Sequence, residues 1–222
     1  MPAFIVFVSG IIVWAALRYW LSPPKKLRRA LRRARRASIA GAPEGEAVRI
    51  DGRVVDGETL IAPLTGRRCV FYVAILEESQ GKRGWIECAR ETRGVPFTVD
   101  DGTGGVIVDP AQAQIDAALD SITKSGLFDD PTPVEAAFLK RHGQKPTCWF
   151  YNRGFRYCEG VFEVGELISV MCYPVRESDP DAVSRTAAGY RDPAPTRLRG
   201  GGSPDHPILL SDASDVTGAR EH

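Results

Sequence analysis

A cysteine and a histidine that could serve as nucleophile and base lie close together in the chain, at Cys148 and His142. A thiol nucleophile needs a base that takes its proton and an acid that orients the base. His142, however, falls at the C-terminal end of a predicted helix, where an imidazole complements the helix dipole. We therefore predict no catalytic site, and we keep Cys148 and His142 as the pair on which a Cys-His hydrolase would depend.

The sequence also lacks the patterns of metal and phosphate sites. The five cysteines form no Cys-x-x-Cys pair and there are only three histidines, so the short-spaced ligand pairs of structural zinc are missing. The acidic turn at Asp100 and Asp101 lacks the alternating ligand spacing of a calcium loop. The segment GTGG has neither the Lys-Ser/Thr of the P-loop nor the glycine spacing of the dinucleotide-binding loop. We expect no cofactor and no metal. Three cysteines in apolar, strand-like segments are expected to be buried thiols: Cys69, Cys158 and Cys172.

A basic and aromatic group of residues is the better candidate for recognition. Arg67 and Arg68 stand in PLTGRRC, and Arg153, Arg156 and Tyr157 stand in NRGFRYCEG. Arginine and tyrosine are favoured at binding hot spots, and on an acidic domain they suit an acidic protein partner. The alternative is that each is an ordinary solvated turn residue.

An apolar run of 19 residues, AFIVFVSGIIVWAALRYWL, covers positions 3–21. A helix of that length spans about 28 Å, close to the roughly 30 Å hydrocarbon core of a bilayer. Arg18 lies near its end and can reach the headgroups, beside Trp14 and Trp20. A cleaved signal peptide would instead need basic residues before the run and a small-residue cleavage site after it. The sequence predicts an uncleaved transmembrane anchor over residues 1–24.

A strongly basic segment follows, which we call the neck: eight of the twelve residues at positions 25–36 are Lys or Arg. Basic residues near a span stay on the cytoplasmic side, so we predict a single-pass protein with its N-terminus outside and the remainder cytoplasmic. The Ala-, Arg- and Gly-heavy composition, together with the single anchor, favours a bacterial inner membrane. The neck also suits anionic lipid, with a topology signal alone as the alternative; nucleic acid is not the expected partner. The residues predicted to contact the membrane are Trp14, Arg18, Trp20, Lys25, Lys26, Arg28, Arg29, Arg32, Arg33, Arg35 and Arg36.

Charge is divided unevenly along the chain. Nine of the 29 Lys and Arg residues precede position 37, whereas all 28 Asp and Glu residues follow it, which leaves the remainder at net −8. An acidic body is repelled by nucleic acid and anionic lipid, so it favours protein partners in the cytosol. Its roughly 185 residues can support one core of moderate size.

The apolar pattern changes from helical to alternating after Ala47, in short runs rich in Val, Ile, Phe and Tyr. We predict a mainly β fold with two accessory helices, an OB-like or small β-barrel domain behind the anchor. Asp101-Gly102 and Gly104-Gly105 predict a hairpin over 97–109. The helices are expected at 110–123, opening at Pro110, and at 132–143, where Thr132 and Glu135 form a capping box. The predicted divisions are an anchor at 1–24, a basic segment and linker at 25–45, a β domain at 46–176, and a Pro/Gly-rich tail at 177–222 with an edge strand at 207–212.

The order of motifs resembles a known family. The segments APLTGRRCVFYVAILEE, GWIECARE, VPFTVDDGTGGVIVDP and RYCEGVFEVGELISVMCYPV are similar to the BAM (beside-a-membrane) or GIDE domain of MULAN-type membrane-anchored E3 ubiquitin ligases and of its shorter prokaryotic relatives. The likeness covers roughly residues 46–176. Those ligases carry a second span and a zinc-binding RING finger, and this sequence has no further run of membrane length and no cysteine after Cys172.

The resemblance implies a membrane-tethered interaction or sensor domain that is not catalytic by itself. A ligand is expected on a strand face, between end loops, or by strand addition at the GVFEV and PILLSD segments. The first alternative is a component of ubiquitin transfer that works with a RING-type partner supplied in trans. The second is the Cys-His hydrolase.

Overall fold

A computed structural model describes residues 23–125, 132–143, 154–178 and 196–218. In these ranges no helix is both long and apolar enough to cross a bilayer. Positions 1–22 of the predicted anchor, with Trp14, Arg18 and Trp20, lie outside them, as do Cys148 and Arg153. The anchor's last two positions, 23 and 24, begin the first described helix.

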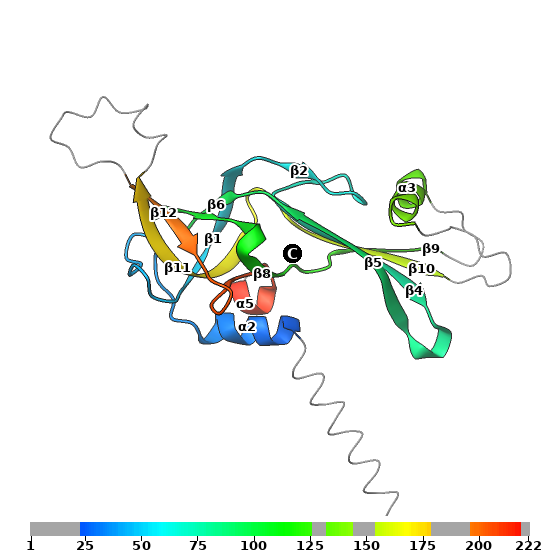
Figure 1. The fold of residues 1–222 in the computed structure, drawn as a ribbon, viewed down its shortest axis with the longest axis horizontal. Helices are drawn as coiled ribbons and strands as arrows, with labels where there is room; N and C mark the ends of the chain where they lie inside the picture. Colours follow the sequence, from blue (N-terminus) through cyan, green and yellow to red (C-terminus); the bar gives the residue numbers. More distant parts are fainter. Residues whose placement is uncertain (1–22, 126–131, 144–153, 179–195, 219–222) are drawn as a thin grey trace, which may run out of the picture.

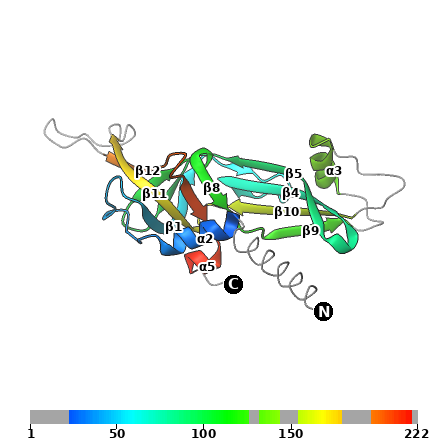
Figure 2. The same cartoon turned by 60° about the horizontal axis from the view of Figure 1, so that its bottom comes forward.

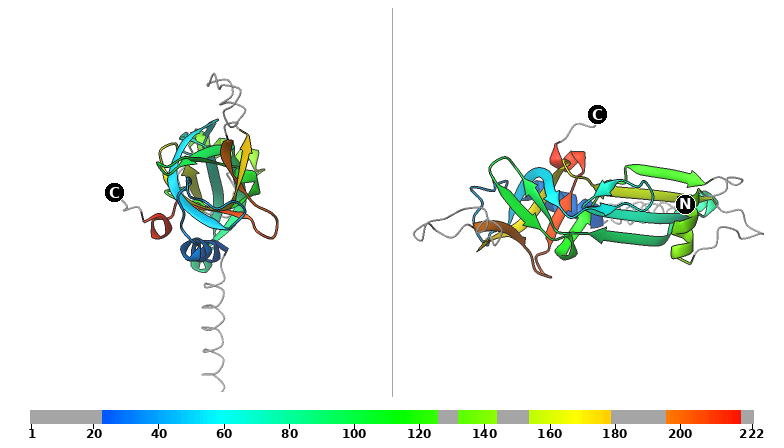
Figure 3. Two further views of the ribbon diagram at one scale, coloured as in Figure 1. Left: turned by 90° about the vertical axis from the view of Figure 1, so that its left-hand side faces the viewer. Right: turned by 90° about the horizontal axis from the view of Figure 1, so that it is seen from above.

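The larger of two main sheets has seven strands in the order β1-β6-β7-β12-β11-β13-β8. Neighbours are antiparallel except β12 with β7 and β13 with β8, which are parallel. The sheet curls so far that β1 pairs with β11 as well as with β6 (Figure 3). The bounds are β1 (Val48–Gly57), β6 (Phe97–Asp100), β7 (Gly105–Val108), β8 (Ala113–Asp116), β11 (Leu167–Ser178), β12 (Thr196–Gly201) and β13 (Ile208–Ser211).

The second sheet has four strands in the order β5-β4-β10-β9, all antiparallel, and it extends away from the first (Figure 1). Its strands are β4 (Phe71–Ser79), β5 (Trp85–Gly94), β9 (Ser121–Ser125) and β10 (Phe155–Phe162), and β2 (Leu60–Ile61) pairs separately with β3 (Arg68–Cys69). The helices are α2 (Pro23–Arg33), α3 (Pro133–Arg141) and α5 (Ser214–Thr217), with short 3₁₀ turns η1 (Gly81–Arg83) and η2 (Pro110–Gln112).

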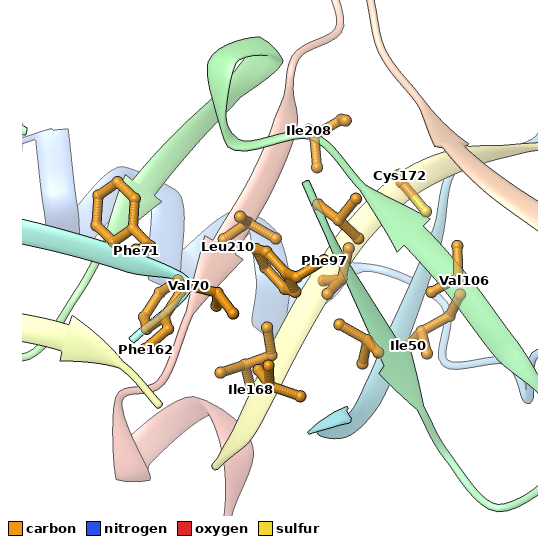
Figure 4. Packing of buried hydrophobic residues seen from close by; sticks show 14 of the residues in the cluster. Ile50, Val70, Phe71, Phe97, Val106, Phe162, Ile168, Cys172, Ile208 and Leu210 are labelled. Atoms are coloured by element: carbon orange, nitrogen blue, oxygen red, sulfur yellow. The ribbon is translucent and has the colours of Figure 1, made fainter. Parts of the chain in front are cut away.

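Strand β4 joins the two hydrophobic cores because it is buried on both faces. Phe71 and Val73 point into the main core with residues of the curled sheet such as Phe97, Ile168 and Leu210 (Figure 4). The alternate residues of β4 point the other way, into a smaller core closed by α3; they are Tyr72, Ala74 and Leu76. The near-continuous apolar run CVFYVAIL follows from this double burial.

The prediction of a mainly β domain with few helices is confirmed, whereas the prediction of one OB-like or small barrel is not. The described strands form sheets, and β4, β5, β9 and β10 make a sheet of their own. Alternating apolar residues show that a segment suits a sheet but do not choose its partner strands. The sequence therefore predicted the strands better than their pairing.

The helix expected at 110–123 is wrong. Pro110 begins only the turn η2, after which Ile115 lies in β8 opposite Leu210, and Ile122 lies in β9 opposite Cys158. Helical spacing of apolar residues is outweighed here by pairing with strands far along the chain.

The helix at 132–143 and the hairpin at 97–109 are confirmed. Thr132 caps α3 and forms the predicted capping box with Glu135, and β6 and β7 pair across the glycine turn. The strand at 207–212 is present as β13, but it lies between β11 and β8 and is not an edge.

The chain after β8 approaches one face of the GVFEV segment closely at its start. A Cβ on Gly160 would lie 2.4 Å from the carbonyl oxygen of Ala118, so the chain after β8 covers this part of β10. Only glycine permits that close approach.

Candidate functional site

The neck is folded against the acidic body. Leu27 and Leu31, on one face of α2, are buried with Leu209 and Val216 from the C-terminal part of the chain. Figure 2 shows α2 and α5 side by side beneath the curled sheet. The helical stripe seen in the sequence is therefore a packing surface.

Ion pairs reinforce this docking. The Nε atom of Arg28 lies 2.5 Å from Oδ2 of Asp116, and Nη2 of Arg32 lies 2.6 Å from Oδ2 of Asp215. The hydrogen bond that Arg28 donates to Asp116 raises the pKa of Arg28. Burial opposes this effect, and the pKa stays above its ordinary value. The basic neck and the acidic body therefore pack together in one structure. From the sequence alone, only the asymmetry of their charges was evident.

The remaining neck charges divide into three groups. Arg35 and Arg36 lie 3.6 Å from Glu46 and 3.4 Å from Asp51, respectively, in exposed ion pairs. Lys26 and Arg33 are exposed, and within the described ranges neither makes an ion pair. Lys25 and Arg29 are half-buried. Lipid contact by the neck stays a prediction, and its outward side is where Lys26 and Arg33 lie.

A buried arginine ties the neck to the body. Arg49, 2% exposed, donates from Nε to Oδ1 of Asp51 at 2.7 Å and from Nη2 to Oγ of Ser169 at 3.2 Å. It also donates to the carbonyl oxygens of Leu31 in α2, at 3.3 Å, and Val216 in α5, at 2.6 Å. Sequence reasoning missed Arg49, since an arginine in VRIDGRVV has no signal that distinguishes it from a surface charge.

A buried carboxylate joins two of the family-like motifs. Glu159 of RYCEG is fully buried and accepts hydrogen bonds from the backbone N–H groups of Leu64, at 2.8 Å, and Thr65, at 3.0 Å. The hydroxyl of Thr65 donates to it as well. The turn of PLTGRRC is thus held by a side chain 94 positions away in the sequence. No local sequence pattern predicts this contact.

A cavity of about 540 Å³ lies between the four-stranded sheet, the chain following η2 and the first turn of α2. Apolar side chains of β4 form one wall, and the segment 113–119 forms the other. Pro24 and Arg28 of the neck contribute to its lining, as does Arg90 of β5. This volume is typical of small-ligand sites.

The predicted arginine and tyrosine surface is not one patch. Arg67 makes a bidentate ion pair with Asp120, at 2.5 and 2.7 Å, and lies 3.5 Å from Glu163 just beyond β10. Arg156, near the start of β10, pairs with Glu77. Roughly 20 Å of strand separates the two sites, at about 3.3 Å per residue.

The other members of the set differ in exposure. Arg68 is exposed and donates to Oγ1 of Thr59 at 3.1 Å, whereas Tyr157 is 1% exposed within the smaller core. Tyr157 is therefore wrong as a surface residue, because alternation along β10 turns it toward α3. Arg156 instead stacks on Trp85, its guanidinium carbon 4.9 Å from the ring centroid.

His142 is held by a carboxylate. Its Nε2 lies 3.2 Å from Oε2 of Glu91, whose Oε1 accepts the hydroxyl of Tyr72 at 2.6 Å. Burial acts to raise the pKa of Glu91, but the hydrogen bonds from Tyr72 and His142 bring it below its ordinary value. An oriented imidazole is half of a nucleophile site, and since Cys148 lies outside the described residues the hydrolase stays untested.

The described cysteines Cys69, Cys158 and Cys172 are buried free thiols, as expected. Burial raises the pKa of Cys69 to about 11 and that of Cys172 to about 12, so neither is an activated thiolate. Within the described ranges no three His, Cys, Asp or Glu side chains are grouped to hold a metal ion.

Two partly buried acidic side chains, Glu166 and Asp212, should make stability depend on pH. Burial, the largest influence, raises the pKa of Glu166 to about 7 and that of Asp212 to about 6. The folded state then binds more protons than the unfolded state between about pH 4 and pH 7, so stability should fall as pH rises through that range. Denaturant unfolding at pH 5 and pH 8 checks this, and Glu166→Gln should reduce the difference; an unchanged difference would assign it to other groups.

Part of the chain matches a model of a known protein family. Residues 75–180 match the family model GIDE, described as E3 Ubiquitin ligase. No curated protein and no solved structure gives a significant match to the chain. The matched range includes β4 from Ile75 onward and all of β5 to β11, so it contains the 113–119 wall of the cavity but not the neck.

Proposed function

We propose that this chain, which carries a GIDE-family segment at residues 75–180, is a membrane-tethered, non-catalytic protein whose β domain binds partners at the cytoplasmic face of a bilayer. Residues 3–21 are the anchor in this proposal. Tethering raises the local concentration of the domain near membrane partners.

The observation that carries the proposal is the docking of α2 on the body through Leu27, Leu31 and the Arg28–Asp116 ion pair. Helix α2 begins at Pro23, two positions after the apolar run. A domain packed against α2 would stand at the bilayer surface instead of swinging on a long linker. Lys26 and Arg33 would then each contribute about 1 kcal/mol of attraction to anionic headgroups.

Two arginines in the middle of the apolar run should release the protein from the membrane. In Ile12→Arg with Val13→Arg, each charge costs roughly 2.5 to 3.5 kcal/mol at the centre of a membrane helix. We expect the variant in the soluble fraction after alkaline washing of membranes, measured by immunoblot. Ile12→Leu with Val13→Leu is the matched control and should remain in the pellet. Retention of the arginine variant would refute the anchor.

Partner binding is tested by crosslinking in cells followed by purification of the full chain and of residues 1–40 alone. Partners captured only by the full chain support recognition by the β domain. The same set captured by both would place recognition in the anchor and neck.

The family description favours one alternative, a component of ubiquitin transfer. A reaction with activating and conjugating enzymes separates the two functions. The non-catalytic proposal expects no conjugates from the chain alone. Conjugates without any RING protein would contradict it, and conjugates only when a RING partner is added would support the alternative acting in trans.

A further inference from the structure

The cavity beside the neck has the lining of a slot for an aliphatic chain. Phe71, Val73 and Ile75 follow one another on the same face of β4, over roughly 13 Å at 3.3 Å per residue. Ile115 and Leu119 face them from the chain after η2, and Leu119 is 41% exposed although it is large and apolar. Its walls therefore offer apolar side chains along an extended path.

This cavity does not suit a peptide ligand. Strand β4 is hydrogen-bonded to β5 on one side and to β10 on the other, so its backbone groups are already paired. A peptide bound over this wall would bury its own N–H and C=O groups against hydrocarbon, which is costly. An acyl chain has no such groups.

The cavity adjoins the point where the chain would leave the bilayer. Pro24, in the first turn of α2, lines it, and residue 21 ends the apolar run. Figure 1 shows α2 and β8 on one side of the four-stranded sheet and α3 on the other. The cavity thus opens on the side of the sheet that the neck occupies.

Two arginines and one carboxylate line the cavity: Arg28, Arg90 and Asp116. Arg90 donates from Nε and Nη2 to Glu87, and its Nη1 has no partner within the described ranges. Its hydrogen bond to Glu87 raises the pKa of Arg90, which remains a cation. Arg28 also lines the cavity, but it already donates a hydrogen bond to Asp116. Arg90 is therefore the guanidinium that keeps N–H donors available for a ligand.

We propose that this cavity binds one acyl chain of an anionic phospholipid drawn from the adjacent leaflet, with Arg90 at the headgroup. The proposal rests on the proposed anchor, because the anchor brings the lipid to the cavity. A bound lipid would make the domain sensitive to the composition of its membrane.

Photocrosslinking of the full chain in vesicles tests this. The vesicles are phosphatidylcholine with a minor amount of phosphatidylglycerol that carries a diazirine on one acyl chain, and crosslinked positions are mapped by mass spectrometry. We expect labels on cavity residues such as Ile75 and Leu119 as well as within positions 3–21. Thr92→Trp, at an exposed cavity-lining position, should reduce the cavity labels roughly tenfold, a loss equivalent to about 1.4 kcal/mol.

Arg93→Trp is the matched control, since the next residue of β5 points to the opposite face of the sheet and is not part of the cavity. Leu119→Asp, which places a charge in the wall, is a second variant in case Thr92→Trp unfolds. Labels confined to 3–21 and the neck, or equal cavity labels in Thr92→Trp and Arg93→Trp, would overturn the cavity proposal and leave the anchor standing. Absence of labels from 3–21 would overturn the proposed function itself.

Discussion

Replacing Arg49 by methionine is expected to destabilise the fold by about 3 to 5 kcal/mol, the usual result of removing one partner from a buried ion pair. The substitution leaves Asp51 with less positive charge nearby and takes a hydrogen-bond donor from the carbonyl oxygens of Leu31 and Val216. Methionine fills a similar volume, so the loss is one of polar contacts and not of packing. Because those carbonyls belong to α2 and α5, both helices should loosen together.

The measurement is denaturant unfolding of the full chain, with Arg36→Met as the matched control. Arg36 approaches the same carboxylate, Asp51, but at 3.4 Å and with a side chain that is 67% exposed, so its loss should cost less than about 1 kcal/mol. Equal destabilisation by the two variants would show that burial of Arg49 contributes little. Hydrogen exchange should also show faster exchange in α2 for Arg49→Met alone.

The second large effect is expected at Glu159. Replacement by glutamine turns one acceptor oxygen into an amide donor facing the N–H groups of Leu64 and Thr65, and removes a charge that strengthens both bonds. Hydrogen bonds to a charged group contribute roughly 1.5 to 3 kcal/mol each, so a loss of about 3 kcal/mol is expected. The turn that carries Arg67 and Arg68 should open before the rest of the domain.

Limited proteolysis with trypsin measures this opening directly, because trypsin cleaves after arginine. Native Glu159→Gln should be cut at Arg67 or Arg68 much faster than the wild type. Glu163→Gln is the control, since that carboxylate is 43% exposed and lies 3.5 Å from Arg67. Equal cleavage in the two variants would mean that Glu159 does not hold the turn.

Sequence patterns predicted those elements whose signals are local. The capping box of Thr132 and Glu135 and the glycine turn after Asp101 act within a few residues, and both structures are present. The failures at 110–123 and at the supposed edge strand have a common cause. Ile115 and Leu210 are 95 positions apart and pair in parallel strands, a choice that depends on the whole sheet.

The candidate site was predictable only in part. The neck was recognised by its charge, and the carboxylates that bind it, such as Asp116 and Asp215, were counted only as net charge because nothing near them in the sequence marks their role. Arg49 and Glu159 were missed for the same reason. The cavity depends on the space between a sheet and a distant segment, which periodicity cannot reveal.

The contact between α2 and α5 also limits the order in which this protein can fold during synthesis. Leu31 packs with Val216, and β12 and β13 occupy interior places in the seven-stranded sheet, so the sheet is incomplete until residues 196–217 have left the ribosome. The β4–β5 hairpin is local and can form early, whereas pairings between distant segments form slowly. By then the apolar run has long been available for insertion. With the proposed anchor inserted, a nascent chain would be held at the membrane with unpaired strands, and we expect chaperones to protect that intermediate.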